Sequence, residues 1–394
     1  MKNLSNQLQL AQLNLMAGKR AKDAAAYRQA LNYLQTGENC LTDDTWKKYY
    51  NLIFDIKKHR MECEYLLHNF TDAERLFLSL LKRAESREDK AALYNQKMIM
   101  LASIAKHEEA LEIGATGLRL LGVRLPKRVG KLDVLNSLLA LKLRLHHKKI
   151  DTLLELPEID DPRLLLTLKM MVNLSLSAYF CQPYLASYMA LDIFKLTLKH
   201  GNSSVSPFAY VIYGAALCAI FKNYDAGHQF GELALKAKNK FGGAQMTAKV
   251  LLYYGNGIAI WIRHINQVIA LNREGLKSAR ETGDLNYAVY HIQSLIFSMF
   301  AGGKALDEIS DECDRFYEFV EQTHDVGALN YLISVMQFIR CVQGKTVHIQ
   351  SLNDEHFSET QHIRNMQNDD IKIILCRHHL IKLRLLYIME DYEG

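Results

Sequence analysis

The stretch YVIYGAALCAIFKNYDAGHQFGELAL, residues 210–235, decides the fold of this chain. Its first half carries apolar and small residues at helical spacing and ends at a polar turn, residues 222–224. Its second half repeats bulky and small residues at offsets of three, seven and ten, namely Tyr224, Gly227, Gly231 and Ala234. These offsets lie on one face of a helix, and small residues there let a second helix approach closely. The stretch therefore predicts a pair of antiparallel helices of the tetratricopeptide type.

The same spacing occurs at three earlier places in the chain. The sets are Arg20, Asp23, Tyr27 and Ala30; Phe70, Ala73, Phe77 and Leu80; and His107, Ala110, Gly114 and Gly117. Short polar segments at 17–20, 67–70 and 105–107 precede them and are predicted as turns. The second and third sets begin 37 residues apart (107 − 70), close to the roughly 34-residue tetratricopeptide period, whereas the first two begin 50 apart (70 − 20). These degenerate repeats predict an all-α fold, a tetratricopeptide-like α-solenoid built as a superhelix of antiparallel helix pairs.

Composition and length favour such a helical stack. Only 5 of the 394 residues are proline, and residues 1–125 and 208–394 contain none, whereas a sheet protein of this size needs many turns. With 49% apolar residues, the chain is also too apolar for a disordered protein. Its length exceeds what one compact core usually supports, and a stack of repeats needs no single core.

The chain is predicted to have three parts. Residues 1–125 hold N-terminal helical repeats, and residues 126–163 hold a basic amphipathic helix followed by a helix breaker, LPEIDDPR at 156–163. Residues 164–394 hold C-terminal repeats that continue the first part and end within a repeat, as expected for a piece of a longer protein. A polar interval at 348–362 is predicted as a loop or short helix. The later helices are predicted at 184–200, 247–263, 266–282, 285–300, 305–322, 328–343 and 370–389.

No pattern of residues predicts catalysis, a cofactor site or a metal site. The GKT at 344–346 matches the end of a phosphate loop, but Ile339 stands where that loop needs its first glycine. HExxH and CxxC motifs are absent from the sequence. Cys376 and His379 have a usable metal spacing, but we expect Cys376 to face the core and the neighbouring histidines to face solvent.

Other aromatic and histidine residues are interpreted as structural. Trp46 and Trp261 lie among helical apolar residues and are predicted to belong to the core. His348, His356 and His362 lie in the polar interval and are predicted at the surface.

Charge, cysteine usage and hydropathy predict a cytoplasmic protein without a transmembrane segment. A net charge of +5 and a pI near 8.6 are too mild to indicate nucleic-acid binding. The 7 cysteines are an odd number without a CxxC pair, which is typical of reduced, buried thiols. The N-terminal residues lack the apolar run of a secretory signal, and the longest apolar run, 208–221, is too short to span a bilayer.

One charge cluster stands out at 119–149, where many basic residues meet a single acid, Asp133. The apolar side of its predicted helix consists of Leu132, Leu135, Leu139 and Leu143. The candidate interaction residues are Arg124, Lys127, Arg128, Lys142, Arg144, Lys148 and Lys149. A basic amphipathic helix of this kind contacts nucleic acid, an anionic membrane or an acidic protein surface. The alternative is a solvated face that the acidic run 151–161 balances in the fold.

Several segments resemble, in order, one region of a known family. They are AGKRAKDAAAYRQALNYL (17–34), MECEYLLHNFTDAERLFLSLLKRA (61–84), EALEIGATGLRLLGVRLP (109–126), IDTLLELPEIDDPR (150–163), the stretch 210–235, LKSARETGDLNYAVYHI (276–292) and VQGKT (342–346). The family comprises large bacterial signalling proteins. In them a helical-repeat region is joined to a serine/threonine-kinase-like domain and an AAA-type, STAND-like ATPase, and in many members a GAF domain and a sensor histidine kinase follow.

The resemblance implies a role for the repeats but no catalysis. In STAND-like ATPases the repeat arm commonly senses a ligand or partner and holds the ATPase off until it binds. The family's phosphate-loop, kinase and phospho-accepting histidine motifs have no counterpart in this sequence. The chain is thus expected to be a non-enzymatic regulatory arm that binds a protein partner or neighbouring domains, with self-association left open. The alternatives are a small-molecule sensor, with a pocket near Tyr253, Tyr254 and Trp261, and anionic-surface binding through 119–149.

Overall fold

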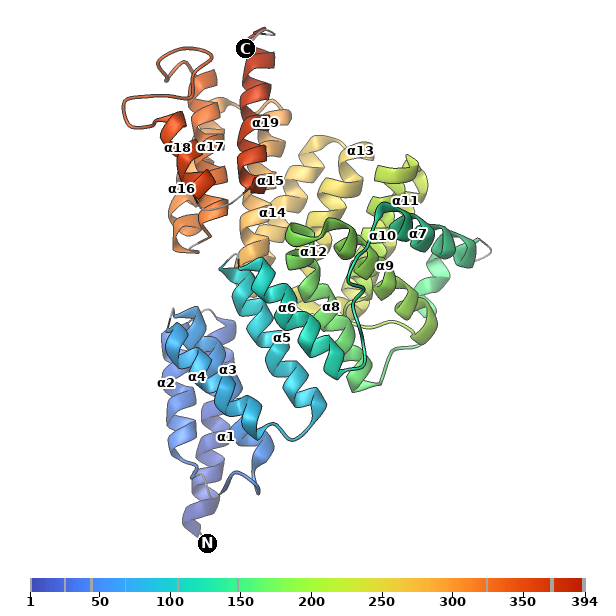
Figure 1. Cartoon of the computed structure of the whole chain (residues 1–394), viewed down its shortest axis with the longest axis vertical. Helices are drawn as coiled ribbons and strands as arrows, with labels where there is room; N and C mark the ends of the chain where they lie inside the picture. Colours follow the sequence, from blue (N-terminus) through green and yellow to red (C-terminus); the bar gives the residue numbers. More distant parts are fainter. Residues whose placement is uncertain are drawn as a thin grey trace.

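The computed structural model describes residues 2–24, 26–42, 45–67, 69–104, 106–146, 149–323, 325–368 and 372–391. Within these ranges all regular secondary structure is helical, apart from an isolated bridge between Glu158 and Asn202. The first and the last helices lie toward opposite ends of the longest axis of the molecule, and the helices of residues 131–262 project to one side of its middle (Figure 1). The predicted all-α fold is confirmed for the described residues.

The first six helices pack as pairs of sequence neighbours. The pairs are α1 (Lys2–Asp23) with α2 (Tyr27–Asn39), α3 (Tyr50–Leu66) with α4 (Phe70–Arg83), and α5 (Arg87–Ser103) with α6 (His107–Leu120). Contacts of α2 with α3, and of α3 and α4 with α5, join each pair to the next. Figure 1 shows these pairs in blue and cyan at the N-terminal end.

The middle of the chain interrupts and then resumes this order. α7 (Lys131–Leu145) packs against α9 (Pro183–His200) and has a 3-10 turn, Ile150–Glu155, after it. Pairing resumes between α8 (Pro162–Cys181) and α9. α10 (Ser206–Phe221) and α11 (Tyr224–Ala237) then form the most extensive contact between two helices in the described part of the chain.

The C-terminal helices form a second run of packed neighbours. They are α12 (Gly243–Tyr254), α13 (Ile260–Ile262), α14 (Ile265–Glu281), α15 (Leu285–Ala301), α16 (Leu306–Gln322), α17 (Val326–Val342), α18 (Glu359–Asn368) and α19 (Lys372–Ile388). α14 packs with α15, α16 packs with α17, and α19 packs on α17. Apart from the break between α12 and α13, these helices lie within a few residues of their predicted bounds, and α18 occupies the end of the predicted polar interval.

The sequence predicts one continuous helix at 247–263, and this prediction is wrong. α12 ends at Tyr254, and one turn of π-helix, Gly255–Ala259, separates it from α13. Gly257 lets the backbone of this turn approach α10 closely. A Cβ on Gly257 would lie 2.8 Å from the Cβ of Ala215.

Three of the predicted turns are confirmed, and the one at 17–20 is wrong. α3, α5 and α10 each end just before the polar segments at 67–70, 105–107 and 222–224. α1 instead continues to Asp23, so the first predicted repeat set is divided between α1 and α2. Gly18 sits inside the helix because it faces α2, where a Cβ would lie 2.8 Å from Cγ of Leu34.

Side-chain caps fix where several helices begin. Ser86 and Asp89 form a capping box at the start of α5, in which the Asp89 N–H donates to Ser86 Oγ at 2.9 Å. Asn223 accepts a backbone N–H bond at the start of α11. Asp161, Asp284 and Asp325 cap α8, α15 and α17 in the same way.

The predicted breaker at 156–163 is docked onto the helices by hydrogen bonds. The Asn202 N–H donates to the Pro157 carbonyl at 2.7 Å, and the Ile159 N–H donates to the Asn202 carbonyl at 2.8 Å. The Asn202 side chain is fully buried and accepts a bond from the Tyr210 hydroxyl at 2.7 Å. These bonds fix the segment that joins α7 to α8.

Buried apolar residues form four clusters within the described residues. The largest extends from α5 to α14, a second extends from α12 to α19, and two smaller ones lie within α1 to α5. Apolar burial is therefore distributed along the chain rather than gathered in one centre.

Candidate interaction surfaces

The predicted packing residues of α4 are buried except at the start of the helix. Ala73, Phe77 and Leu80 are 1%, 4% and 0% exposed. Phe70, the first residue of α4, is 43% exposed, and its ring packs edge-on against Tyr65 with 5.0 Å between centroids. Phe70 therefore belongs partly to the surface.

The small residues of α6 and α11 mark close approaches between helices. A Cβ on Gly114 would lie 2.5 Å from Sδ of Met98, and one on Gly117 would lie 2.5 Å from Cε of Met170. Of the other residues of these two sets, Ala110, Gly227, Gly231 and Ala234 are buried, and His107 and Tyr224 are half-buried. The glycines and alanines therefore position the helices and offer no binding surface.

The predicted interaction residues surround α7 and are exposed. This holds for Arg124, Lys127, Arg128, Lys142, Arg144 and Lys149, whereas Lys148 lies outside the described residues. The inner side of α7 buries Val134, Leu138 and Leu141. Most of the predicted apolar side faces outward instead, since Leu132, Leu139 and Leu143 are 72%, 42% and 76% exposed, while Leu135 is half-buried. α7 therefore has two apolar sides, of which one faces away from the protein.

The acidic run after α7 does not neutralise these cations. Asp151 pairs with Lys236 of α11 at 3.1 Å. Asp133, the acid within α7, accepts the Gly130 N–H at 2.8 Å and so caps its own helix. Across the part of the chain that the structure describes, none of the six exposed cations forms an ion pair. The six side chains are exposed, as on a solvated face, and no direct ion pair joins them to the described acidic residues of 151–161.

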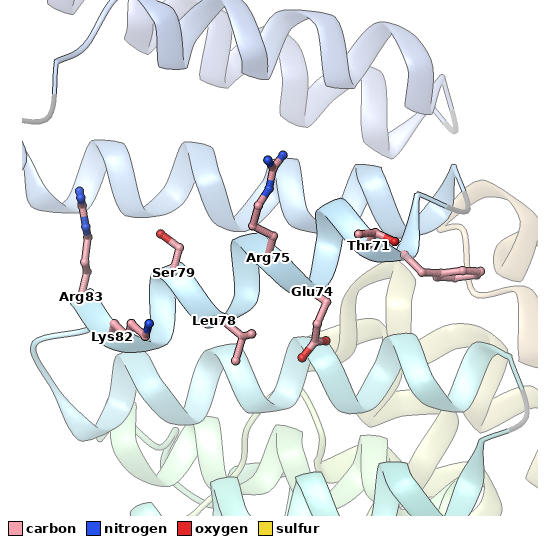
Figure 2. A pocket seen from close by; sticks show the side chains of 8 residues that line it. Thr71, Glu74, Arg75, Leu78, Ser79, Lys82 and Arg83 are labelled. Carbon is pink, nitrogen blue, oxygen red and sulfur yellow. The ribbon is translucent and has the colours of Figure 1, made fainter.

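An open groove of about 920 Å³ runs along the outer side of α4 (Figure 2). Its lining residues are Phe70, Thr71, Glu74, Arg75, Leu78, Ser79, Lys82 and Arg83. Leu78 is 49% exposed. Glu74 pairs with Lys97 of α5 at 2.8 Å, and Arg75 pairs with Asp72. Figure 2 shows Leu78 and Glu74 pointing to one side of α4 and Arg75 to the other. The groove combines apolar area with charges along its edges.

The residues of the predicted ligand pocket differ in their surroundings. Tyr254 is buried, and its hydroxyl donates to Glu232 at 2.7 Å; burial and the nearby carboxylate raise its pKa to about 12. Trp261 is 54% exposed, so its predicted place in the core is wrong, and its ring lies 5.6 Å from that of Tyr224. Neither the α4 groove nor a second groove of about 350 Å³ along α14 contains Tyr253, Tyr254 or Trp261.

A buried polar cluster joins α17, α18 and α19. Ser334 Oγ lies 3.0 Å from Nε2 of His362 and from Nδ1 of His378, whose Nε2 lies 3.4 Å from Glu359. Cys376 is exposed while His378 is 0% and His362 6% exposed, so their predicted orientations are wrong. Serine, histidine and carboxylate are the groups of a hydrolase triad, but Ser334 is also 0% exposed and out of reach of a substrate. The polar contacts of this cluster hold α17, α18 and α19 against one another.

A metal site and a membrane-spanning helix each set requirements on the described residues. No group of three His, Cys, Asp or Glu side chains among them is placed to hold a metal ion. By length and composition one described helix, α8, would reach across a bilayer. Half of the 18-residue apolar stretch of α8 is buried inside the protein, as in a core helix. Leu168, Met171 and Leu174 are among its buried residues.

Comparison with known proteins connects the chain to signal transduction. No protein-family model matches it. Hybrid signal transduction histidine kinase G from Dictyostelium discoideum is 22% identical to it over 366 residues, which cover 86% of this chain and 11% of the kinase. The chain therefore spans about a tenth of the length of this relative. This weak similarity is compatible with a regulatory region of a signalling protein.

Proposed function

We propose that this chain is a non-catalytic regulatory region of a larger signalling protein, which binds a protein partner or neighbouring domains and controls their activity. The alignment with the histidine kinase carries this proposal, because it extends over 86% of the chain and 11% of the kinase. The sequence has no kinase or nucleotide-binding motif of its own. A role beside catalytic domains, rather than within them, accounts for both observations.

The helix pairs support an α-solenoid of the tetratricopeptide type as the architecture of this region. Successive pairs contact their neighbours, and glycines occupy close contacts within α6 and α11. Solenoids of stacked helix pairs present extended surfaces on which they bind other proteins. The architecture thus favours binding of another protein over enzymatic catalysis.

The α4 groove is the surface that we assign to the protein partner. Leu78 offers exposed apolar area, and Lys82 and Arg83 add positive charge along the same helix, where Arg75 is paired with Asp72. Glu74 is already paired with Lys97. An amphipathic helix that carries a bulky apolar anchor with acidic residues beside it matches this pattern.

A cytoplasmic location and the absence of enzymatic activity are parts of the proposal. All 7 cysteines are free thiols, and Cys63, Cys218, Cys313 and Cys341 are buried, which fits a reducing compartment. The STAND-like ATPase, the serine/threonine-kinase-like domain and the bacterial setting that the resemblance implies stay predictions.

Binding in trans tests the proposal. The purified chain is titrated by calorimetry with the remaining domains of its own polypeptide, using the wild type and Leu78→Glu. We expect Leu78→Glu to weaken binding about tenfold or more, because burial of a leucine contributes ~1.5–3 kcal/mol and a buried carboxylate opposes it. Leu10→Glu on α1 is the matched control, since Leu10 is 47% exposed and lies outside the groove. Undetectable wild-type binding, or an equal loss in both variants, contradicts the proposal.

A further inference from the structure

α7 belongs to a larger exposed surface that combines bulky apolar side chains with cations. Nζ of Lys142 in α7 lies 5.3 Å from the ring centroid of Phe221, at the end of α10. Nζ of the next residue, Lys222, lies 5.9 Å from the ring of Trp261 in α13. These two contacts connect α7, the end of α10 and α13. We call this surface the basic–apolar face.

The bulky apolar side chains of the basic–apolar face are largely exposed to solvent. Leu143 is 76% exposed, Trp261 is 54% exposed and Ile220 is 50% exposed. Leu139 and Leu143 are four residues apart on α7 and therefore lie on one side of the helix, next to Lys142. The buried side of the same helix already holds its own apolar residues.

The cations of this face have no carboxylate partners among the described residues. Lys142, Arg144 and Lys222 form no ion pair there. Asp133 is engaged at the start of α7. A surface with several unpaired cations creates a positive potential that attracts an anionic surface.

A lipid bilayer fits this face better than a protein helix does. A partner helix places its apolar anchors in a groove, but the α4 and α14 grooves do not include these residues. α7 lies at the outer edge of the molecule (Figure 1). Its Leu139 and Leu143 side chains are 42% and 76% exposed. Outward leucine and tryptophan side chains beside lysine and arginine match the membrane interface, where the indole sits at headgroup level and the cations meet anionic headgroups.

We propose that the basic–apolar face docks this chain onto an anionic lipid bilayer. Leu139, Leu143 and Trp261 enter the headgroup layer, while Lys142, Arg144 and Lys222 contact anionic headgroups. The docking is peripheral and uses a surface separate from the α4 groove. A failure of membrane docking would therefore leave the proposed regulatory role unaffected, and the reverse also holds.

Cosedimentation of the purified 394-residue chain with vesicles tests this docking. We expect binding to vesicles of phosphatidylcholine with phosphatidylserine, little binding to phosphatidylcholine alone, and loss of binding as salt is raised. Lys142→Glu is expected to weaken partition about 25-fold, since each cation near an anionic bilayer contributes on the order of a fivefold factor and charge reversal removes one such factor and adds a second that opposes binding. Leu143→Gln is expected to weaken it about tenfold, the factor for losing a buried leucine.

Two variants outside the face serve as matched controls. Lys277→Glu on α14 reverses an exposed charge, with the Lys277 side chain 76% exposed, and Leu383→Gln on α19 replaces a leucine that is 62% exposed. Both are expected to bind like the wild type. Circular dichroism of each variant checks that it is folded.

Tryptophan fluorescence reports which face touches the lipid. The chain has 2 tryptophans, and Trp46 is 7% exposed, so Trp46→Phe leaves Trp261 as the reporter. We expect its emission to shift to shorter wavelength with anionic vesicles, and no shift in Trp261→Phe. Equal binding to both vesicle types, equal loss in the control variants, or retention on heparin without vesicle binding each overturns the proposal.

Discussion

Gly214 of α10 and Gly227 of α11 lie backbone against backbone. A Cβ on Gly214 would lie 2.8 Å from the Gly227 carbonyl oxygen, and a Cβ on Gly227 would lie 2.9 Å from the Gly214 carbonyl oxygen. Because the opposing atoms are backbone, rotation of a side chain cannot relieve either clash. The extensive contact between α10 and α11 therefore depends on the absence of side chains at both positions.

Gly227→Ala is predicted to destabilise the protein by about 1–3 kcal/mol, the cost of overpacking a close contact. The loss is expected although alanine is the better helix former by about 1 kcal/mol. Urea unfolding followed by circular dichroism measures the change. Gly255→Ala is the control, since a Cβ there would meet its nearest neighbour at 3.8 Å. A Gly227→Ala variant as stable as the control would show that the two backbones do not lie this close.

A second prediction concerns the ion pair of Lys249 in α12 and Asp284 at the start of α15. Lys249 is 8% exposed, bonds to Asp284 and lies 4.3 Å from the ring centroid of Tyr287. Asp284→Asn retains the helix cap but leaves the ammonium group buried without its anion. We expect a loss of about 3 kcal/mol in the free energy of unfolding.

The double variant Lys249→Met/Asp284→Asn distinguishes a lost pair from lost packing. It removes both charges, so we expect it to recover most of the stability that Asp284→Asn loses. The urea midpoints of the four proteins in this cycle provide the coupling energy. Additive losses would show that the two side chains do not interact.

The pH dependence of stability tests the burial of His291. This side chain is 0% exposed, and burial lowers its pKa to about 4, although a bond to the Ala248 carbonyl favours the charged form. The unfolded chain takes up this proton near pH 6.5. Its contribution to stability is therefore complete above pH 6.5 and declines as the pH falls toward 4.

At pH 5 the protein is predicted to have lost about 2 kcal/mol through His291 alone. The measurement compares the free energy of unfolding at pH 7 and pH 5 in the wild type and in His291→Gln. The difference between the two pH values should be about 2 kcal/mol smaller in the variant. Identical pH differences would mean that His291 is protonated in the folded state or that water reaches it.

Helix positions were largely predictable because their signals are local. Three of the predicted turns coincide with real helix ends, and Asn223 both ends the polar turn and caps α11. Gly18 lies in the turn predicted at 17–20, but the structure places it inside α1. In a sequence, a glycine that ends a helix looks the same as a glycine that lets a neighbouring helix approach. Only the position of Leu34 of α2 distinguishes the two cases.

The orientation of α7 was not predictable from periodicity. Val134, Leu138 and Leu141 form one apolar side, and Leu132, Leu139 and Leu143 form another. A helix with two apolar sides can pack by either, and the contact with α9 decides the choice.

The buried polar cluster lacked any local signal. Ser334 and His378 are 44 residues apart, and packing of α17 against α19 brings them together. The apolar neighbours of Trp261 predict a place in the core, yet α13 is a three-residue helix in which Trp261 is 54% exposed. Long-range packing therefore determined the site features that the sequence missed.

The most direct test of the proposed regulatory role measures the transfer of labelled phosphate from ATP in the full-length polypeptide, which we propose to be a signalling protein that contains this chain. The wild type, Leu78→Glu and Leu10→Glu are compared with the 394-residue chain alone. The account predicts a rate changed several-fold in Leu78→Glu, an unchanged rate in Leu10→Glu, and no label on the isolated chain. Equal rates in all three proteins, or phosphate transfer by the isolated chain that a substitution within it abolishes, would contradict it.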